Sequence, residues 1–277
     1  MVKFDQAGCL KKRAPISPMW KDRIERLGTR VVDFFTAVYE LSLLFWNTVK
    51  SLNSIWFYRR QVIEQLYVFL VRTLPIAAII SVFLGLGMMI QGVYQSSVLF
   101  PRELTINVIF KTTVYEICPI VLSLVLAGKL GGSLAAEIGS MKISEQIDAL
   151  ETLSLEPIGF LVMPRVLAGL TMLPIIIIFA NLVALFSVFF VASIMTDWIS
   201  PQEFVSGLKI NLRVFELYFG NFIKPAVYGF VIALVGSYFG LKTRGGALGV
   251  GKSSTNAVVV SAILIVIFDY YLDRVLL

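Results

Sequence analysis

The sequence contains no histidine and only two cysteines among its 277 residues. Without histidine, zinc and haem sites with imidazole ligands are excluded, and so is acid–base catalysis by histidine. Cys9 and Cys118 lie far apart in the sequence, and Cys118 falls inside a predicted membrane span. A disulfide framework or a thiolate metal site is therefore not expected. We expect no metal and no cofactor in this chain.

Charge is also scarce, since 15% of the residues are charged, 57% are hydrophobic and the mean hydropathy is +0.83. A soluble fold could not bury so much apolar surface. Uncharged runs of 29 residues between Arg72 and Arg102 and of 31 residues between Arg165 and Asp197 are long. Each exceeds the roughly 20 apolar residues that cross a hydrocarbon core ~30 Å thick. The chain is therefore predicted to be an all-α integral membrane protein.

Five membrane spans are predicted from the apolar runs. Their approximate limits are residues 74–94, 108–128, 167–195, 225–241 and 257–271. If the N-terminus is inside, the inner segments hold 18 of the 24 lysines and arginines. Positive loops stay in the cytoplasm, so we predict a cytoplasmic N-terminus and an outer, periplasmic C-terminus. The net charge of +6 then reflects topology and anionic lipid, and no nucleic-acid partner is expected.

Two segments precede the spans. Residues 1–30 are polar and basic, and we expect them in the cytoplasm. Residues 31–60 are apolar but are interrupted by Asp33, Glu40 and Lys50. Because their apolar residues recur at helical spacing, an interfacial helix in the headgroup plane fits better than a span. Residues 61–277 would then form the five-span domain.

A phosphate-binding pattern occurs near the end of the chain. Residues 246–253, GALGVGKS, match G-x-x-x-x-G-K-[ST], in which Lys252 would reach a bound phosphate. The pattern has that meaning only after a buried strand within an NTPase sheet, and here it lies between two membrane spans. We interpret it as a tight cytoplasmic turn, with Ser253, Ser254 or Thr255 capping the next helix. We expect neither ATP binding nor enzymatic activity in this chain.

The centre of the chain carries an acidic segment, AAEIGSMKISEQIDALETL, at residues 135–153. Its apolar stripe at helical spacing comprises Ile143, Ile147 and Leu150. Glu145 and Asp148 fall on a different face, and Ser144 can cap the start of the helix. The spacing predicts a short amphipathic helix over about 141–152, on the cytoplasmic surface between the second and third spans.

Two interpretations of this helix are open. It could be a plain surface helix with a solvated acidic face, which is the common case. The connection between the two spans is however far longer than the 2–8 residues that typically join neighbouring helices. Four glycines at its base also indicate close backbone packing. A docking helix for a cytoplasmic partner is therefore the favoured interpretation.

Glu116 lies about two turns inside the second predicted span, ~12 Å from its outer end. A carboxylate at that depth is costly unless it faces protein or a wet cavity, and such residues are functional by default. Pro119 removes one helical hydrogen bond and frees the carbonyl of Tyr115. Glu116 is either a packing carboxylate, paired with Lys111 or a hydroxyl of the fourth span, or a polar contact in a cavity.

Two stretches resemble MlaE/YrbE-type permeases, the membrane subunits of ABC transporters that move lipids. They are GKLGGSLAAEIGSMKISEQIDALETLSLEPIGFLVMPRVLAG and LVGSYFGLKTRGGALGVGKSSTNAVVVSAILI. The resemblance covers roughly residues 60–277. The family pattern Arg-Glu-Leu-Gly-Pro stands here as Tyr115-Glu116-Ile117-Cys118-Pro119. The glutamate and proline carry over and the arginine does not, which puts an Arg–Glu pair or a phosphate contact at that point in doubt.

The resemblance implies specific partners. In the family, the segment between spans 2 and 3 is a coupling helix seated in a separate ATPase subunit, which binds the ATP and magnesium. Two permeases and two ATPases form the core, and an MCE-domain protein takes phospholipid on the outer side. The implied ATPase-coupling residues are Glu137, Gly139, Met141, Lys142, Glu145, Gln146 and Asp148. The implied lipid-cavity residues are Gln91, Gly92, Tyr94, Tyr115, Glu116 and Pro119.

We therefore expect a homodimeric permease of a bacterial inner membrane, in which ATPase closure pushes the coupling helix and tilts spans 1, 2 and 5. An ion-gradient-driven secondary transporter would need paired carboxylates within the membrane and inverted repeats. We expect only Glu116 to be deep, and five spans do not halve. An intramembrane enzyme lacks a visible catalytic arrangement in this sequence. A membrane scaffold would not need Glu116.

Overall fold

A computed structural model describes residues 19–95, 101–195 and 199–276. Residues 1–18, with Cys9, lie outside this range, as do 96–100. Every regular element in the described ranges is helical and none is a strand, which confirms the all-α prediction. Five helices are long and apolar enough to cross a membrane. These five helices are Arg59–Gln95, Arg102–Ile143, Ile158–Ser193, Val214–Leu241 and Gly246–Val275.

Several of these helices contain π-helical turns, in which the backbone holds one extra residue per turn. The second span consists of α3 (Arg102–Thr112), η2 (Thr113–Ile117), α4 (Cys118–Leu126), η3 (Ala127–Gly131) and α5 (Gly132–Ile143). The third consists of η4 (Ile158–Val162), α7 (Met163–Phe190) and η5 (Val191–Met195), and the fourth of α9 (Val214–Tyr218), η6 (Phe219–Ile223) and α10 (Lys224–Leu241). The first and fifth are the unbroken helices α2 (Arg59–Gln95) and α11 (Gly246–Leu276).

The helices extend well past the predicted apolar limits. The second predicted span covered 108–128, whereas the helix runs over 42 residues from Arg102 to Ile143. At 1.5 Å per residue this helix is ~63 Å long, about twice the hydrocarbon thickness. Apolar content marks only the part of a helix that lies in the hydrocarbon core, so the rest extends beyond that core.

The chain divides into two compact units, residues 1–43 and 44–277. The described part of the first unit is helical and belongs to α1 (Met19–Ser51). This helix begins well before residue 31 and ends at Ser51, and η1 (Leu52–Ser54) follows it. The predicted interfacial helix over 31–60 therefore has different limits, because residues 19–30 are mostly good helix formers. Its position in the headgroup plane stays a prediction.

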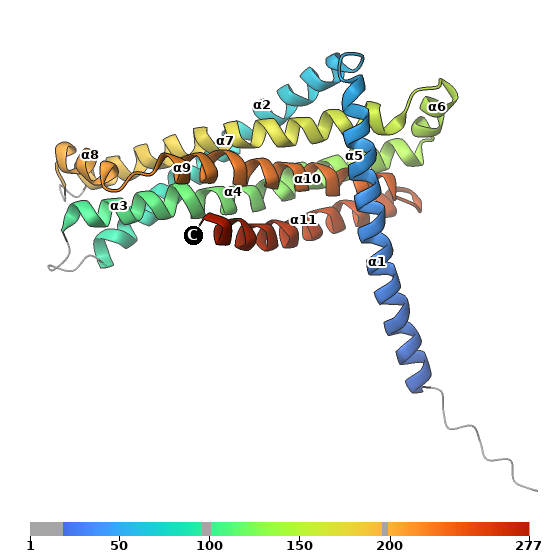
Figure 1. Cartoon of the computed structure of the whole chain (residues 1–277), viewed down its shortest axis with the longest axis horizontal. Helices are drawn as coiled ribbons and strands as arrows, with labels where there is room; N and C mark the ends of the chain where they lie inside the picture. Colours follow the sequence, from blue (N-terminus) through green and yellow to red (C-terminus); the bar gives the residue numbers. More distant parts are fainter. Residues whose placement is uncertain (1–18, 96–100, 196–198, 277) are drawn as a thin grey trace, which may run out of the picture. The chain divides into compact units, whose positions relative to one another are not determined.

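Within the second unit, α7 packs against α2 and α10, and α10 packs against α5 and α11. The helix α6 (Gln146–Thr152) lies at one end of the bundle together with the α10–α11 connection (Figure 1). The start of α3 and the short helix α8 (Pro201–Lys209) lie at the other end (Figure 1). The acidic segment and the glycine-rich turn therefore share one end, as the predicted topology requires.

Two glycines allow the third and fourth spans to cross closely. A Cβ added at Gly169 would collide with the carbonyl of Gly229 and lie 3.1 Å from Ala233 Cβ. A Cβ added at Gly229 would collide in turn with the carbonyl of Gly169. Small residues at such crossings let helix backbones touch within a membrane, where the hydrophobic effect does not drive association.

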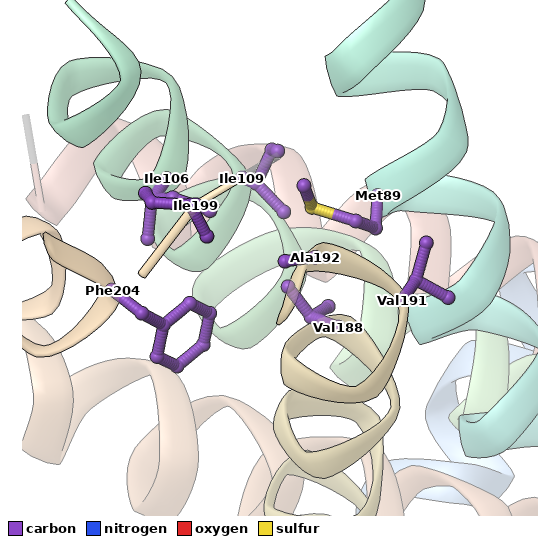
Figure 2. Packing of buried hydrophobic residues seen from close by; sticks show 8 residues of the cluster. All are labelled: Met89, Ile106, Ile109, Val188, Val191, Ala192, Ile199 and Phe204. Carbon is purple, nitrogen blue, oxygen red and sulfur yellow. The ribbon is translucent and has the colours of Figure 1, made fainter. Parts of the chain in front are cut away.

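The α8 end of the bundle contains an apolar cluster from α2, α3, α7, η5 and α8, together with Ile199 just before α8 (Figure 2). It contains Met89, Ile106, Ile109, Val188, Val191, Ala192, Ile199 and Phe204. Ser200 and Glu203 form a capping box at the start of α8. Asn107 donates hydrogen bonds to the carbonyls of Gly207 (3.1 Å) and Ile210 (2.7 Å) at the end of α8. The capping box is local to α8, whereas Asn107 and the packing of Phe204 attach this helix to the bundle.

Residues 246–253 form the first turns of α11 and do not make a phosphate-binding loop. Gly245 and Gly246 have φ of 88° and 70°, so the predicted turn with positive φ lies at the point where the helix begins. Ser253, Ser254 and Thr255 lie inside α11, and the prediction that one of them caps it is wrong. The Ser254 hydroxyl instead donates to the carbonyl of Gly132 at 2.9 Å. The helix starts early because two glycines complete the reversal before the serines.

Candidate functional site

A cluster of charged side chains lies within the transmembrane bundle, around Lys224. The Lys224 ammonium is 2.9 Å from Glu116 Oε2 and 3.3 Å from Asp269 Oδ1, and it also forms an ion pair with Asp273. Its side chain is 0% exposed. The hydroxyl of Tyr228 donates to Asp269. One buried cation is therefore surrounded by three carboxylates from two other helices.

Local helix geometry places each member of this cluster. Asp269 and Asp273 are four residues apart on α11 and so share one face, as do Lys224 and Tyr228 on α10. Glu116 comes from the π-helical turn η2 of the second span. In that turn the carbonyl of Tyr115 accepts a hydrogen bond from Lys224 at 3.3 Å. The prediction that Pro119 frees this carbonyl thus has a clear structural consequence.

The cluster carries more negative than positive charge. Glu116, Asp269 and Asp273 each offer an oxygen, and these three oxygens lie within 4.8 Å of one another, as ligands of a cation would. The Lys224 ammonium contacts all three carboxylates and occupies this role. Removing one partner of a buried ion pair leaves an uncompensated charge, which costs about 3–5 kcal/mol. The four residues therefore depend strongly on one another.

Several expectations about Glu116 need correction. Its predicted partner Lys111 instead pairs with Glu216 at 3.2 Å, because Lys111 lies on another face of the helix. Glu116 is also not the only deep carboxylate, since Asp269 is 8% exposed and lies beside it. Neither Lys224 nor Asp269 nor Asp273 was among the predicted site residues.

The other predicted cavity residues have different surroundings. Tyr115 is buried, and its ring packs edge-on against Phe110 at 5.9 Å between centroids. Gly92 lacks a side chain where Ile109 packs, since an added Cβ would collide with that isoleucine. Gln91 and Tyr94 are exposed. The structure thus brings Glu116 and the Tyr115 carbonyl into the cluster. The lipid-cavity assignment of all six residues, Pro119 included, stays a prediction.

The acidic segment folds differently from the predicted single helix over 141–152. The helix α5 ends at Ile143, and α6 begins only at Gln146. Ser144 does not cap α6, because its hydroxyl donates to the carbonyl of Ser140 at 2.9 Å. Glu145 adopts φ of 58°, a left-handed conformation that breaks the helix. The prediction failed because the apolar spacing continues across this turn.

One face of the acidic segment packs against the bundle, and its other face is exposed and charged. Ile147 is 3% exposed and packs in a cluster with Ile138 and Leu161. Glu145, Gln146 and Asp148 are exposed, and Asp148 accepts a hydrogen bond from Lys142 at 2.7 Å. Met141 packs against the apolar cluster. The end of the bundle therefore presents an acidic helix on a fixed base.

Two of the predicted coupling residues make internal contacts at the base of this segment. Glu137 accepts a hydrogen bond from Arg165 at 2.6 Å, and the Arg165 side chain is only 5% exposed. A Cβ added at Gly139 would lie 2.7 Å from Thr243 Oγ1, so this glycine allows the α10–α11 connection to approach. These contacts were not predicted from the sequence.

Comparison with known proteins identifies the family. The family described as Permease MlaE matches residues 62–275. The chain belongs to the MlaE permease family. A probable ABC transporter permease protein of Rickettsia felis is 32% identical over 249 residues, covering 90% of this chain and 95% of that protein. Another of Synechocystis is 35% identical over 216 residues, covering 78% of this chain and 81% of the relative.

The similarity extends to a plant protein. The chloroplastic protein TRIGALACTOSYLDIACYLGLYCEROL 1 of Arabidopsis thaliana is 32% identical over 205 residues, covering 73% of this chain and 57% of that protein. Membership in the MlaE family makes this chain a multi-pass membrane permease of an ABC transporter. The family makes it a transporter subunit and implies ATPase partners on the cytoplasmic side.

Proposed function

We propose that this MlaE-family permease moves phospholipid across or out of a bacterial inner membrane. It works as a homodimer with two ATPase subunits in the cytoplasm and an MCE-domain protein on the outer side. Its N-terminus is cytoplasmic and its C-terminus periplasmic. No metal or cofactor is required in this chain, since ATP and magnesium bind to the ATPases.

One observation carries the coupling role. The acidic helix α6 is exposed at the end of the bundle and is joined to the second and third spans through Ile147. An exposed helix on a fixed base can receive a push from a partner and pass it to the spans. Glu145, Gln146 and Asp148 are the residues that we assign to the ATPase contact, since all three are exposed.

The charged cluster supports the transport role. It joins the second, fourth and fifth spans through Glu116, Lys224, Asp269 and Asp273. The side chain of Glu116 is 42% exposed, whereas Lys224 is fully covered. Glu116 can therefore meet a polar lipid headgroup while it stays paired. In our proposal, ATPase closure shifts these spans, and the lipid must bind the open state better than the closed state.

The lipid substrate is supported by the family and by one relative's name. The Arabidopsis protein bears the name of a galactosyl diacylglycerol, which is a membrane lipid. The ion-gradient alternative gains support from the neighbouring carboxylates Glu116 and Asp269. The Lys224 ammonium between them argues against it, because that ammonium already fills the position of a transported cation.

Isolation of the permease from native membranes tests the proposal. We expect a co-purifying ATPase with bound nucleotide, an MCE-domain protein and phospholipid recovered by organic extraction. A chain that purifies with none of these, under detergent conditions that preserve other ABC transporters, would contradict it. A sodium- or proton-dependent uptake without ATP would favour the ion-gradient alternative.

A further inference from the structure

The second span is held by two buried cations that make the same pair of contacts. Lys224 donates to Glu116 at 2.9 Å and to the Tyr115 carbonyl at 3.3 Å. Arg165 donates to Glu137 at 2.6 Å and to the Leu161 carbonyl at 2.6 Å. In each case the carboxylate belongs to the helix Arg102–Ile143 and the carbonyl belongs to a π-helical turn. The first cation comes from α10 and the second from α7.

The Arg165 contacts lie where the acidic segment re-enters the bundle. The π-helical turn η4 (Ile158–Val162) directly precedes α7, and Leu161 belongs to this turn. π-helical turns occur frequently at functional sites in proteins. Arg165 satisfies a carbonyl within the turn and at the same time binds α5, so it fixes the geometry of η4 relative to the second span. Its Nε–H is buried without a hydrogen-bond partner among the described residues.

The apolar contacts of α6 meet the same two elements. Ile147 packs with Ile138 of α5 and with Leu161 of η4. Ile138 follows Glu137 in sequence, and Leu161 is the residue whose carbonyl binds Arg165. A push on α6 therefore arrives at α5 and η4 together, at the point where the Glu137–Arg165 ion pair links them. The ion pair thus adds a charged link to the apolar contacts that Ile138, Ile147 and Leu161 make there.

We propose that Glu137 and Arg165 form the joint that makes the second and third spans move together when the ATPase pushes α6. This inference rests on the proposed function and changes one assignment within it. Glu137 is then a positioning residue that works inside the permease, whereas Glu145 and Asp148 contact the partner. The Glu137 carboxylate is half-exposed, but the guanidinium that it binds is buried.

The test uses the intact transporter, with its ATPase and MCE-domain partners, in lipid nanodiscs. The variants are Glu137→Gln, Glu137→Asp and the double exchange of Glu137→Arg with Arg165→Glu. Glu64→Gln is the matched control, since Glu64 is an exposed carboxylate on α2. The measurements are recovery of the ATPase subunit, ATP hydrolysis, and phospholipid moved per ATP hydrolysed.

We expect Glu137→Gln to retain the ATPase subunit and to hydrolyse ATP, but to move about tenfold less lipid per ATP, within the usual range of couplings between sites. The double exchange should restore most of the lipid movement per ATP. Glu137→Asp should retain part of this lipid movement, because aspartate keeps the negative charge. Glu64→Gln should match the native protein. Rescue by exchange is not expected for a residue that contacts only a partner.

Two results would overturn the inference. One is loss of the ATPase subunit in Glu137→Gln without recovery in the double exchange, which would make Glu137 a partner contact. The other is unchanged lipid movement per ATP in Glu137→Gln. If the double exchange does not assemble, the comparison of Glu137→Gln with Glu137→Asp decides between these outcomes. Failure of the proposed function itself is distinguishable, because the native chain would then recover no ATPase.

Discussion

Lys224 and Glu116 join the fourth span to the second within the membrane, with 2.9 Å between the ammonium nitrogen and the carboxylate oxygen. The two residues are far apart in sequence, and the lysine side chain has no exposed surface. Because Asp269 and Asp273 bind the same ammonium, the fifth span is tied to the other two. Three of the five spans are therefore linked through a single positive charge.

Replacement of this lysine tests the link. We expect Lys224→Met to lower the free energy of unfolding by about 3–5 kcal/mol, because it leaves three carboxylates near one another without a counter-charge. Thermal unfolding of the detergent-solubilised protein measures the change. Lys209→Met is the control, since Lys209 is exposed on α8 and should have little effect.

Calcium binding tests whether the Lys224 ammonium occupies a cation position among the three carboxylates. In Lys224→Ala, the oxygens of Glu116, Asp269 and Asp273 can approach a divalent cation, which prefers oxygen ligands at 2.3–2.6 Å. Calcium should then raise the unfolding temperature of this variant and leave that of the native protein unchanged. Equal effects of calcium on both proteins would contradict the view that Lys224 acts as a tethered cation.

The crossing of the third and fourth spans predicts a second stability effect. Gly169→Ala places a methyl group against the Gly229 carbonyl, so the helices must separate. Overpacking of this kind typically costs about 1–3 kcal/mol. Gly87→Ala is the matched control, because nothing lies within 4 Å of a Cβ at that position. Thermal unfolding should show a clear loss for the first variant and none for the second, and equal losses would contradict the close crossing.

Glu203 predicts a pH dependence at the α8 end of the bundle. The backbone N–H and the hydroxyl of Ser200 both donate to its carboxylate at 2.8 Å, and they hold the pKa of Glu203 below its ordinary value. A carboxyl with a lowered pKa stabilises the folded state above its unfolded pKa of about 4.3, and this contribution is lost as the pH falls through the folded pKa.

Hydrogen exchange of residues 200–209 checks this sign. We expect amide protection in α8 to decrease as the pH falls below about 4, after correction for intrinsic exchange rates. In Glu203→Gln this decrease should be absent, because the amide does not titrate. Protection in the native protein that increases on acidification would contradict the capping geometry.

The helical conformation of residues 246–253 predicts that Lys252 has no role in nucleotide binding. A complex that contains Lys252→Ala should bind ATP analogues at its ATPase subunits and hydrolyse ATP as the native complex does, since residues 246–253 of this chain are helical. Photolabelling with an azido-ATP measures the binding. Labelling of this chain that depends on Lys252 would contradict the helical assignment and would restore the phosphate-loop interpretation.

Features that depend on apolar runs and local spacing can be predicted from the sequence. The five spans follow from long uncharged runs, and Glu116 stands out because it interrupts one of them. The helix break at Glu145 could not be predicted, since the apolar residues Ile143 and Ile147 keep helical spacing on either side of it. In the structure the turn is defined by the left-handed conformation of Glu145, together with the packing of Ile147 against α5 and η4.

The partners of Glu116 were missed for a related reason. Lys224 and Asp273 lie near the ends of apolar runs, where charged residues are normally read as membrane-surface groups. A useful signal was present in the sequence, since Asp269 and Asp273 are four residues apart at the end of a long helix and so share one face. The contacts between helices across the bundle depend on tertiary packing, and they cannot be read from apolar runs and local spacing in a single sequence.

The most direct test of the central claim is photo-crosslinking from α6 in native membranes. A crosslinking amino acid at Glu145 should capture a nucleotide-hydrolysing subunit, and the same group at Gln202, on the opposite end of the bundle, should not. In a second experiment the crosslinking amino acid replaces Gln146, and the charges of Glu145 and Asp148 are reversed. This charge reversal should abolish crosslinking to the ATPase while the permease still inserts into the membrane. Capture of the ATPase from Gln202, or capture of none from Glu145, would contradict the account.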